Sequence, residues 1–154
     1  MRGLIIGGFI ILMISVLMCG CMENENISDD LSRDFLEAFL TEILNKDFDS
    51  AVEKVLNSSG KHITGEKREK LISLWESFTN FSSSSFEIVE SAPIPYDMLA
   101  STPFSTGESF LVSWTHTMGE NIFQQNTTYF VVIYKGNRYI WLPPAEESIL
   151  DLVQ

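Results

Sequence analysis

The sequence predicts an α+β domain in which helices pack on one face of an antiparallel sheet. Up to about Phe81, apolar residues recur three and four positions apart, as they do in amphipathic helices. From Phe86 onward, β-branched and aromatic residues fill long runs that short turn sequences separate. Helices that precede a run of strands are typical of α+β domains. The 154 residues suffice for a leader and one domain with a buried core.

An apolar leader precedes this domain. Arg2 is followed by an apolar run over residues 3–22 that is long enough to cross a bilayer. The sequence "MCGC" at 18–21 resembles a lipobox, in which a small residue, here Gly20, precedes a cysteine that receives a lipid. This resemblance implies lipid attachment at Cys21. Two alternatives stay open: a retained transmembrane helix, and a conventional secretory signal.

The first interpretation divides the chain into three parts. Residues 1–20 are a signal peptide with a lipobox, residues 21–30 are a polar tether, and residues 31–154 are the domain. A lipoprotein of this kind is expected at the outer face of the cytoplasmic membrane, held there by its N-terminal lipid or by a retained helix. Both cysteines lie in the opening stretch, so the domain contains no disulfide and no cysteine nucleophile.

Three helices are predicted in the first half of the domain. The first follows the capping residues 28–30, the second covers residues 48–56, and Thr64 caps the third. Their apolar faces are formed by Leu31, Phe35, Phe39, Leu40, Ile43 and Leu44; by Phe48, Ala51, Val52, Val55 and Leu56; and by Leu71, Ile72, Leu74, Trp75 and Phe78.

Four strands are predicted in the second half. They cover Phe86–Glu90, Glu108–Thr117, Ile122–Lys135 and Arg138–Leu142. Hairpin turns are expected at "MGEN" (118–121) and at "KGNR" (135–138), with Gly136-Asn137 at the tip of the latter.

The segments between and after these strands are predicted from composition. "SSSS" at 82–85 is expected to be a flexible joint, and residues 92–106, with three of the five prolines, an irregular loop. "AEESILDLV" (145–153) favours a short terminal helix.

The order of elements resembles the nuclear-transport-factor-2-like, or cystatin-like cone, superfamily. The resemblance rests on "FLEAFLTEILNKDFDSAVEKVLN" (35–57), where a polar break separates two helices, and on the helix "EKREKLISLWESF" (66–78). It covers roughly residues 30–142. It implies that the sheet is curved and that it encloses an apolar cone able to hold a small ligand.

Two residues are pocket candidates. Phe110, Val112, Trp114 and His116 share one face of a predicted strand, because alternate residues of a strand point the same way. If that face lines the cone, Trp114 and His116 border the pocket. No acidic residue is close in sequence to orient the His116 ring, so no catalytic residue is assigned. No metal or cofactor is expected either, because the two histidines are far apart and the domain lacks thiols.

Four asparagines begin Asn-x-Ser/Thr triplets that an exported chain could have glycosylated. They are Asn26, Asn57, Asn80 and Asn126.

The formal charge of −11 excludes some partners and leaves others open. An acidic surface repels phosphates, so no nucleic-acid partner is expected. Aromatic residues on both faces of the strands permit a homodimer through the sheet. The expected function is therefore non-catalytic binding of a small ligand or a protein partner by a lipid-anchored surface protein. The alternatives are a proton-abstracting enzyme of the cone type, isomerase- or dehydratase-like, acting on a small apolar substrate, and an accessory subunit of a membrane complex.

Overall fold

The structure is a computed structural model that describes residues 23–151. The chain divides into two units, Met1–Asp34 and Phe35–Gln154, with the boundary inside helix α2 (Glu23–Leu44). Residues 23–30, predicted as a polar tether, belong to this helix. The predicted signal peptide and the lipid attachment at Cys21 lie outside the described residues. None of the helices within residues 23–151 is long and apolar enough to cross a membrane.

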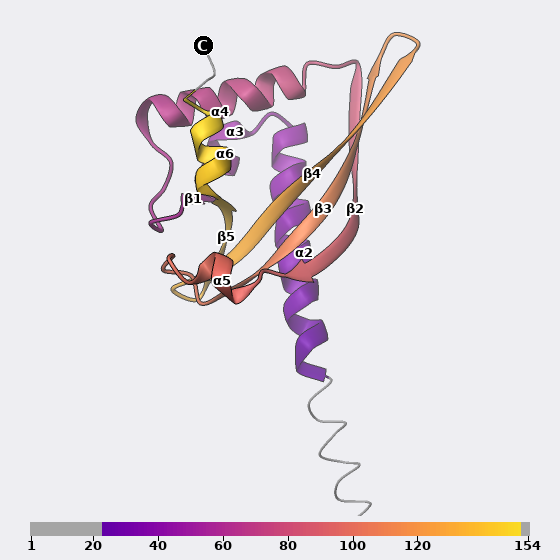
Figure 1. Cartoon of the computed structure of the whole chain (residues 1–154). Helices are drawn as coiled ribbons and strands as arrows, with labels where there is room; N and C mark the ends of the chain where they lie inside the picture. Colours follow the sequence, from indigo (N-terminus) through magenta and orange to yellow (C-terminus); the bar gives the residue numbers. More distant parts are fainter. Residues whose placement is uncertain (1–22, 152–154) are drawn as a thin grey trace, which may run out of the picture. The chain divides into compact units, whose positions relative to one another are not determined.

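The unit from Phe35 onward has the predicted α+β class, with N-terminal helices that precede a curved sheet (Figure 1). After α2 its elements are α3 (Phe48–Val52), β1 (Val55–Asn57), α4 (Gly65–Phe78), β2 (Ser83–Pro93), α5 (Tyr96–Leu99), β3 (Thr106–Met118), β4 (Asn121–Tyr134), β5 (Asn137–Leu142) and α6 (Pro144–Ile149). The five strands have the order β1-β5-β4-β3-β2 and do not close into a barrel. The expected terminal helix is α6.

The sheet is mixed rather than antiparallel, because β1 pairs with β5 in parallel. The prediction that residues 48–56 form one helix is wrong: α3 ends at Val52, and Val55 and Leu56 belong to β1. Val55 and Leu56 are buried in the strand, as they would also be on the apolar face of the predicted helix, so their apolar character does not distinguish the two structures. Pairing with β5, which is distant in sequence, decides in favour of the strand. The amide of Ile140 also donates to the carbonyl of Lys54 at 2.8 Å.

Serines 83–85 are part of β2, not a flexible joint. They pair with Thr117, His116 and Thr115 of β3. Serine has little intrinsic preference for strands, but the ladder to β3 satisfies its backbone groups. The hydroxyl of Ser84 also contacts Nδ1 of His116 at 2.8 Å. Tertiary pairing therefore overrides what the composition indicates.

Residues 92–106 are less irregular than predicted. Ala92 and Pro93 end β2, and Tyr96–Leu99 forms the short helix α5. This segment contributes to a second apolar cluster, which consists of Leu56, Ile94, Leu99, Phe104, Val132 and Trp141. The cluster fixes the loop against the sheet, because its apolar side chains leave water together.

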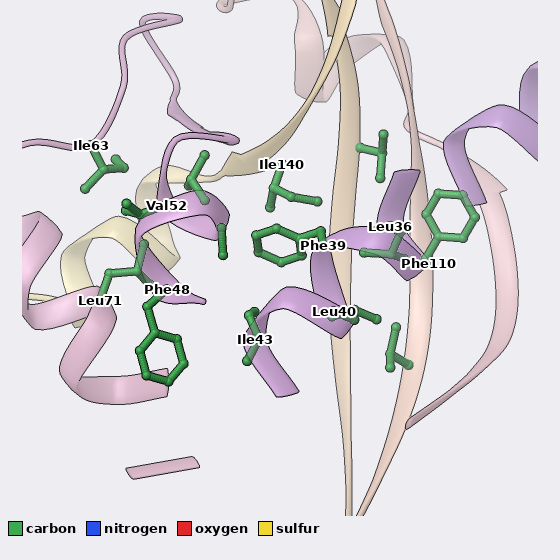
Figure 2. Close-up of a cluster of buried hydrophobic side chains, with 14 of the residues drawn as sticks. Leu36, Phe39, Leu40, Ile43, Phe48, Val52, Ile63, Leu71, Phe110 and Ile140 are labelled. Carbon is green, nitrogen blue, oxygen red and sulfur yellow. The ribbon is translucent and has the colours of Figure 1, made fainter. Parts of the chain in front are cut away.

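The main core lies between the helices and the sheet. Leu36, Phe39, Leu40 and Ile43 of α2 are at most 1% exposed and pack with Phe110 of β3 and other buried residues (Figure 2). Leu36, which the predicted stripe omits, is fully buried, whereas Leu31, which the stripe includes, is 49% exposed. The stripe is therefore rotated slightly from the prediction.

The turn between β4 and β5 is shifted by one residue from the prediction. Tyr134 pairs with Asn137, so the two-residue loop is Lys135-Gly136 and not Gly136-Asn137. Lys135 has φ 51° and Gly136 has φ 81°, the positive angles that a type I′ hairpin turn requires at both positions. The turn between β3 and β4 is at the predicted place, with Gly119 at φ 63°.

Candidate ligand-binding site

A cavity of about 460 Å³ lies between α4 and β4. Its apolar wall comes from Ile43, Leu71, Leu74, Trp75, Phe78 and Phe81, and its polar wall from Ser77, Gln125, Thr127 and Tyr129. The spacing of Leu71, Leu74, Trp75 and Phe78 places them on one face of α4. The three β4 residues alternate along the strand and thus point to one side. None of these ten side chains carries a formal charge at neutral pH.

A smaller cavity of about 160 Å³ adjoins the first. The two share Leu71, Trp75, Thr127 and Tyr129, so the hollow continues from α4 toward β5 and α6. Glu146 of α6 also lines the smaller cavity and is half-buried. Burial raises the pKa of its carboxyl group, because the charged form loses hydration. This end of the hollow therefore holds the one acidic group that lines either cavity.

Tyr129 stands where the two cavities meet, and its phenol stays neutral. Burial raises its pKa; the indole N–H of Trp114 acts in the opposite direction, and the charge of Glu146 raises it further. The Trp114 N–H is buried and makes no hydrogen bond of good geometry. The Tyr129 ring packs edge-on to Phe39 of α2, with 6.2 Å between ring centroids. A neutral phenol held in this way can donate a hydrogen bond to a ligand.

Trp114 and His116 lie on the predicted face of β3 and are buried, but they are not among the side chains that line the cavity. Their rings stack on each other with 5.9 Å between centroids. Phe78, which does line the cavity, contacts both rings edge-on at 4.7 and 4.5 Å. The two candidates therefore support the cavity wall from behind Phe78.

The His116 ring is enclosed by aromatic groups. Phe81 stacks on it at 4.5 Å, Ser84 occupies its Nδ1, and Nε2 is buried without a partner. Burial lowers the pKa of His116, because no acidic group compensates the lost hydration of the imidazolium. The ring is therefore neutral at pH 7. A neutral ring with its free nitrogen enclosed serves packing better than proton transfer.

A larger hollow of about 600 Å³ opens on the other side of α4. It is lined by Lys46, Phe48, Ser73, Glu76, Ser77, Thr79 and Asn80. Charged, hydroxyl and amide groups dominate it, so water fills it at little cost and a ligand gains little by displacing that water. We therefore place the candidate site in the apolar cavity.

Tyr129 and Glu146 were not predicted as site residues. Tyr129 is expected from the sequence only as one aromatic residue among several on the strands, and Glu146 lies in a short terminal helix. Both line the smaller cavity, because α6 follows β5, which pairs with β4. No sequence spacing indicates this arrangement.

The glycosylation triplets fall in different settings. Asn26 lies within α2, whereas Asn80 and Asn126 have exposed side chains, the latter on β4. Asn57 is half-buried at the end of β1, and its side-chain oxygen accepts hydrogen bonds from the amides of Ser59 and Lys61. Asn57 thus already holds a turn in place.

Over the described part of the chain, no three histidine, cysteine or acidic side chains gather as a metal site would require. Comparison with known proteins finds no family model, curated protein or solved structure that matches this chain.

Proposed function

We propose that this domain binds a small, uncharged, apolar ligand in the cavity between α4 and β4, without acting on it chemically. The observation that carries the proposal is the cavity itself, about 460 Å³ with apolar side chains on one wall and neutral polar groups on the other. Ligand sites usually have 300 to 1,000 Å³ of this composition. An ionised ligand would lose its hydration among these walls without gaining an opposite charge.

The polar groups define the ligand further. Tyr129 offers a neutral hydroxyl donor, while Thr127 and Gln125 can donate or accept. These groups lie on the β4 side, whereas α4 provides only apolar contacts and Ser77. The preferred ligand therefore has an apolar body and one neutral acceptor group, such as a carbonyl, directed at β4.

We also propose that the protein is a lipoprotein, anchored through Cys21 at the outer face of the cytoplasmic membrane, after removal of a signal peptide. The support is the lipobox-like sequence at 18–21. The order of helices before a curved sheet with long hairpins supports, in addition, membership of the nuclear-transport-factor-2-like superfamily. A retained helix in an accessory subunit, and a protein partner, are the alternatives.

An enzymatic role through His116 has weaker support. The free Nε2 is buried, and aromatic rings contact the imidazole from several sides. A base must reach the proton that it removes.

Fluorescence titration tests ligand binding. The full-length protein in detergent should bind N-phenylnaphthylamine, a neutral apolar dye, and Ser77→Phe should weaken this binding at least tenfold by filling the cavity. Ser73→Phe is the matched control, because Ser73 lies one turn earlier on α4 and lines only the polar hollow. If the wild type binds no dye in excess of empty micelles, or if both variants lose binding equally, the proposal fails.

A second dye tests the direction of the ligand. Prodan is neutral and carries a ketone. Tyr129→Phe should weaken prodan binding several-fold and leave N-phenylnaphthylamine binding unchanged, because only prodan has a strong acceptor for the phenol. Equal effects on both dyes would contradict the assigned role of Tyr129.

A further inference from the structure

Strand β4 has a free edge that the fold leaves unpaired. Strand β3 pairs with β4 along its whole length, from Asn121 to Ile133, whereas β5 pairs only with Phe130–Tyr134. Within the described residues, the segment Asn121–Asn126 thus has a strand neighbour on one side only, and all six residues are exposed. Figure 1 shows this part of the β3–β4 hairpin running past the end of β5.

The other long edge of the sheet is protected, and this edge is not. Strand β2 has a bulge at Val89, and its edge carries Glu87, Glu90 and Pro93. Bulges, charges and proline are the usual devices that stop an edge strand from pairing with another chain. Residues 121–134 contain no charged residue and no proline, and the ladder from β3 to β4 is regular throughout. The β4 edge therefore lacks the features that prevent an edge strand from pairing with another chain.

We propose that the free edge of β4, residues 121–126, pairs antiparallel with the same segment of a second copy of this chain. The chain has a formal charge of −11, so two copies repel each other across most of their surface. The edge segment is uncharged, so two copies can approach each other there without this repulsion. A two-fold axis then places the segment of one copy against the identical segment of the other. Pairing would also cover Ile122 and Phe123, which are 68% and 47% exposed.

The geometry limits the register. A two-fold axis perpendicular to the sheet keeps the two concave faces on the same side. Because opposite residues of a ladder point to one face, odd-numbered residues must pair with odd-numbered ones. Phe123 and Gln125 then lie on the cavity side in both copies, as Gln125 already does. At most five residues of each segment can then face the other copy, so the contact is small and we expect dimerisation to depend on protein concentration.

Sedimentation of the full chain in detergent, at several protein concentrations, tests the proposal. The wild type should form dimers, and Gln124→Lys or Gln124→Glu alone should shift the midpoint concentration at least tenfold upward, because like charges then face each other near the axis. Mixing the two variants should restore a heterodimer. Ser85→Lys is the matched control, since Ser85 is an exposed polar residue on the protected edge.

A wild type that stays monomeric at every concentration would overturn the proposal, and so would a mixture that does not recover dimers. An equal effect of Ser85→Lys would also overturn it, because it would show that net charge alone controls association. Gln124 does not line the cavity, so N-phenylnaphthylamine binding should be unchanged in all variants and reports that they are folded.

Discussion

The two halves of the β3–β4 hairpin belong to the same pair of strands but have different surroundings. In the inner half, next to β5, Phe110 and Val131 belong to the main core, while Val132 belongs to the cluster on the opposite face. In the outer half, β3 keeps one buried face with Trp114 and His116, but β4 is exposed from Asn121 to Asn126. Strand β5 and the α5 segment reach only the inner half. On β4, the inner half is therefore part of the core, and the outer half is available for contacts.

A matched pair of phenylalanines tests this contrast most strongly. Phe110 is fully buried and Phe123 is 47% exposed, on neighbouring strands of the same hairpin. Phe110→Ala should lower the free energy of unfolding by about 3–5 kcal/mol, because it removes core contacts and leaves a cavity. Phe123→Ala should cost less than about 1 kcal/mol. Urea unfolding at low protein concentration measures both, and equal losses would contradict the division into two halves.

Two glycines give a second, smaller comparison. A Cβ on Gly107, at the inner end, would lie 2.7 Å from the carbonyl oxygen of Val131 and 2.8 Å from Cδ1 of Ile94. Gly107→Ala should therefore cost about 2 kcal/mol, since the backbone of β4 cannot move away easily. Gly119, at the outer turn, has open space around it but φ 63°. Gly119→Ala should cost about 1 kcal/mol, from backbone strain alone.

Thermal unfolding of both glycine variants at one pH ranks them. If Gly119→Ala were the more damaging change, the outer turn would contribute more to stability than its exposure indicates.

The pH dependence of stability gives the smallest effect. Burial lowers the pKa of folded His116 below the ordinary value of about 6.5. The unfolded chain therefore takes up the proton first, and stability falls as the pH drops below about 6.5. His116→Phe should reduce this loss between pH 6.5 and 5.5, by at most about 1 kcal/mol, which is the limit for a histidine that does not protonate in the folded state. Urea unfolding at these two pH values checks the sign; an unchanged slope would show that His116 is accessible to water.

The elements that the sequence predicts correctly are those with long local patterns. The helix α4 and the strands β3, β4 and β5 lie within a residue or two of the predicted bounds. Errors occur where pairing with a strand that is distant in sequence determines the local structure. Val55 and Leu56 have helical spacing yet pair with β5, and the serines at 83–85 have loop composition yet pair with β3.

The candidate site was predictable only in part. Alternation along β3 correctly places Trp114 and His116 on a buried face, but the groups that line the cavity come mainly from α4 and β4. The approach of Glu146 to Tyr129 depends on how β5 returns α6 to the sheet. A sequence pattern describes one element at a time, and the side chains that line the two cavities come from α2, β1, α4, β4, β5 and α6.

The parallel pair of β1 and β5 has a consequence for synthesis. Val55 of β1 pairs with Ile140 of β5, so a strand from the first half of the domain cannot pair until a strand near its end has been synthesised. Contacts between such distant positions slow folding, because the loop between them must close first. A chain that is synthesised from its N-terminus presents α2, α3 and α4 long before β5. The domain therefore completes its fold only once residues up to Leu142 are available, and until then Val55 and Leu56 lack their strand partner.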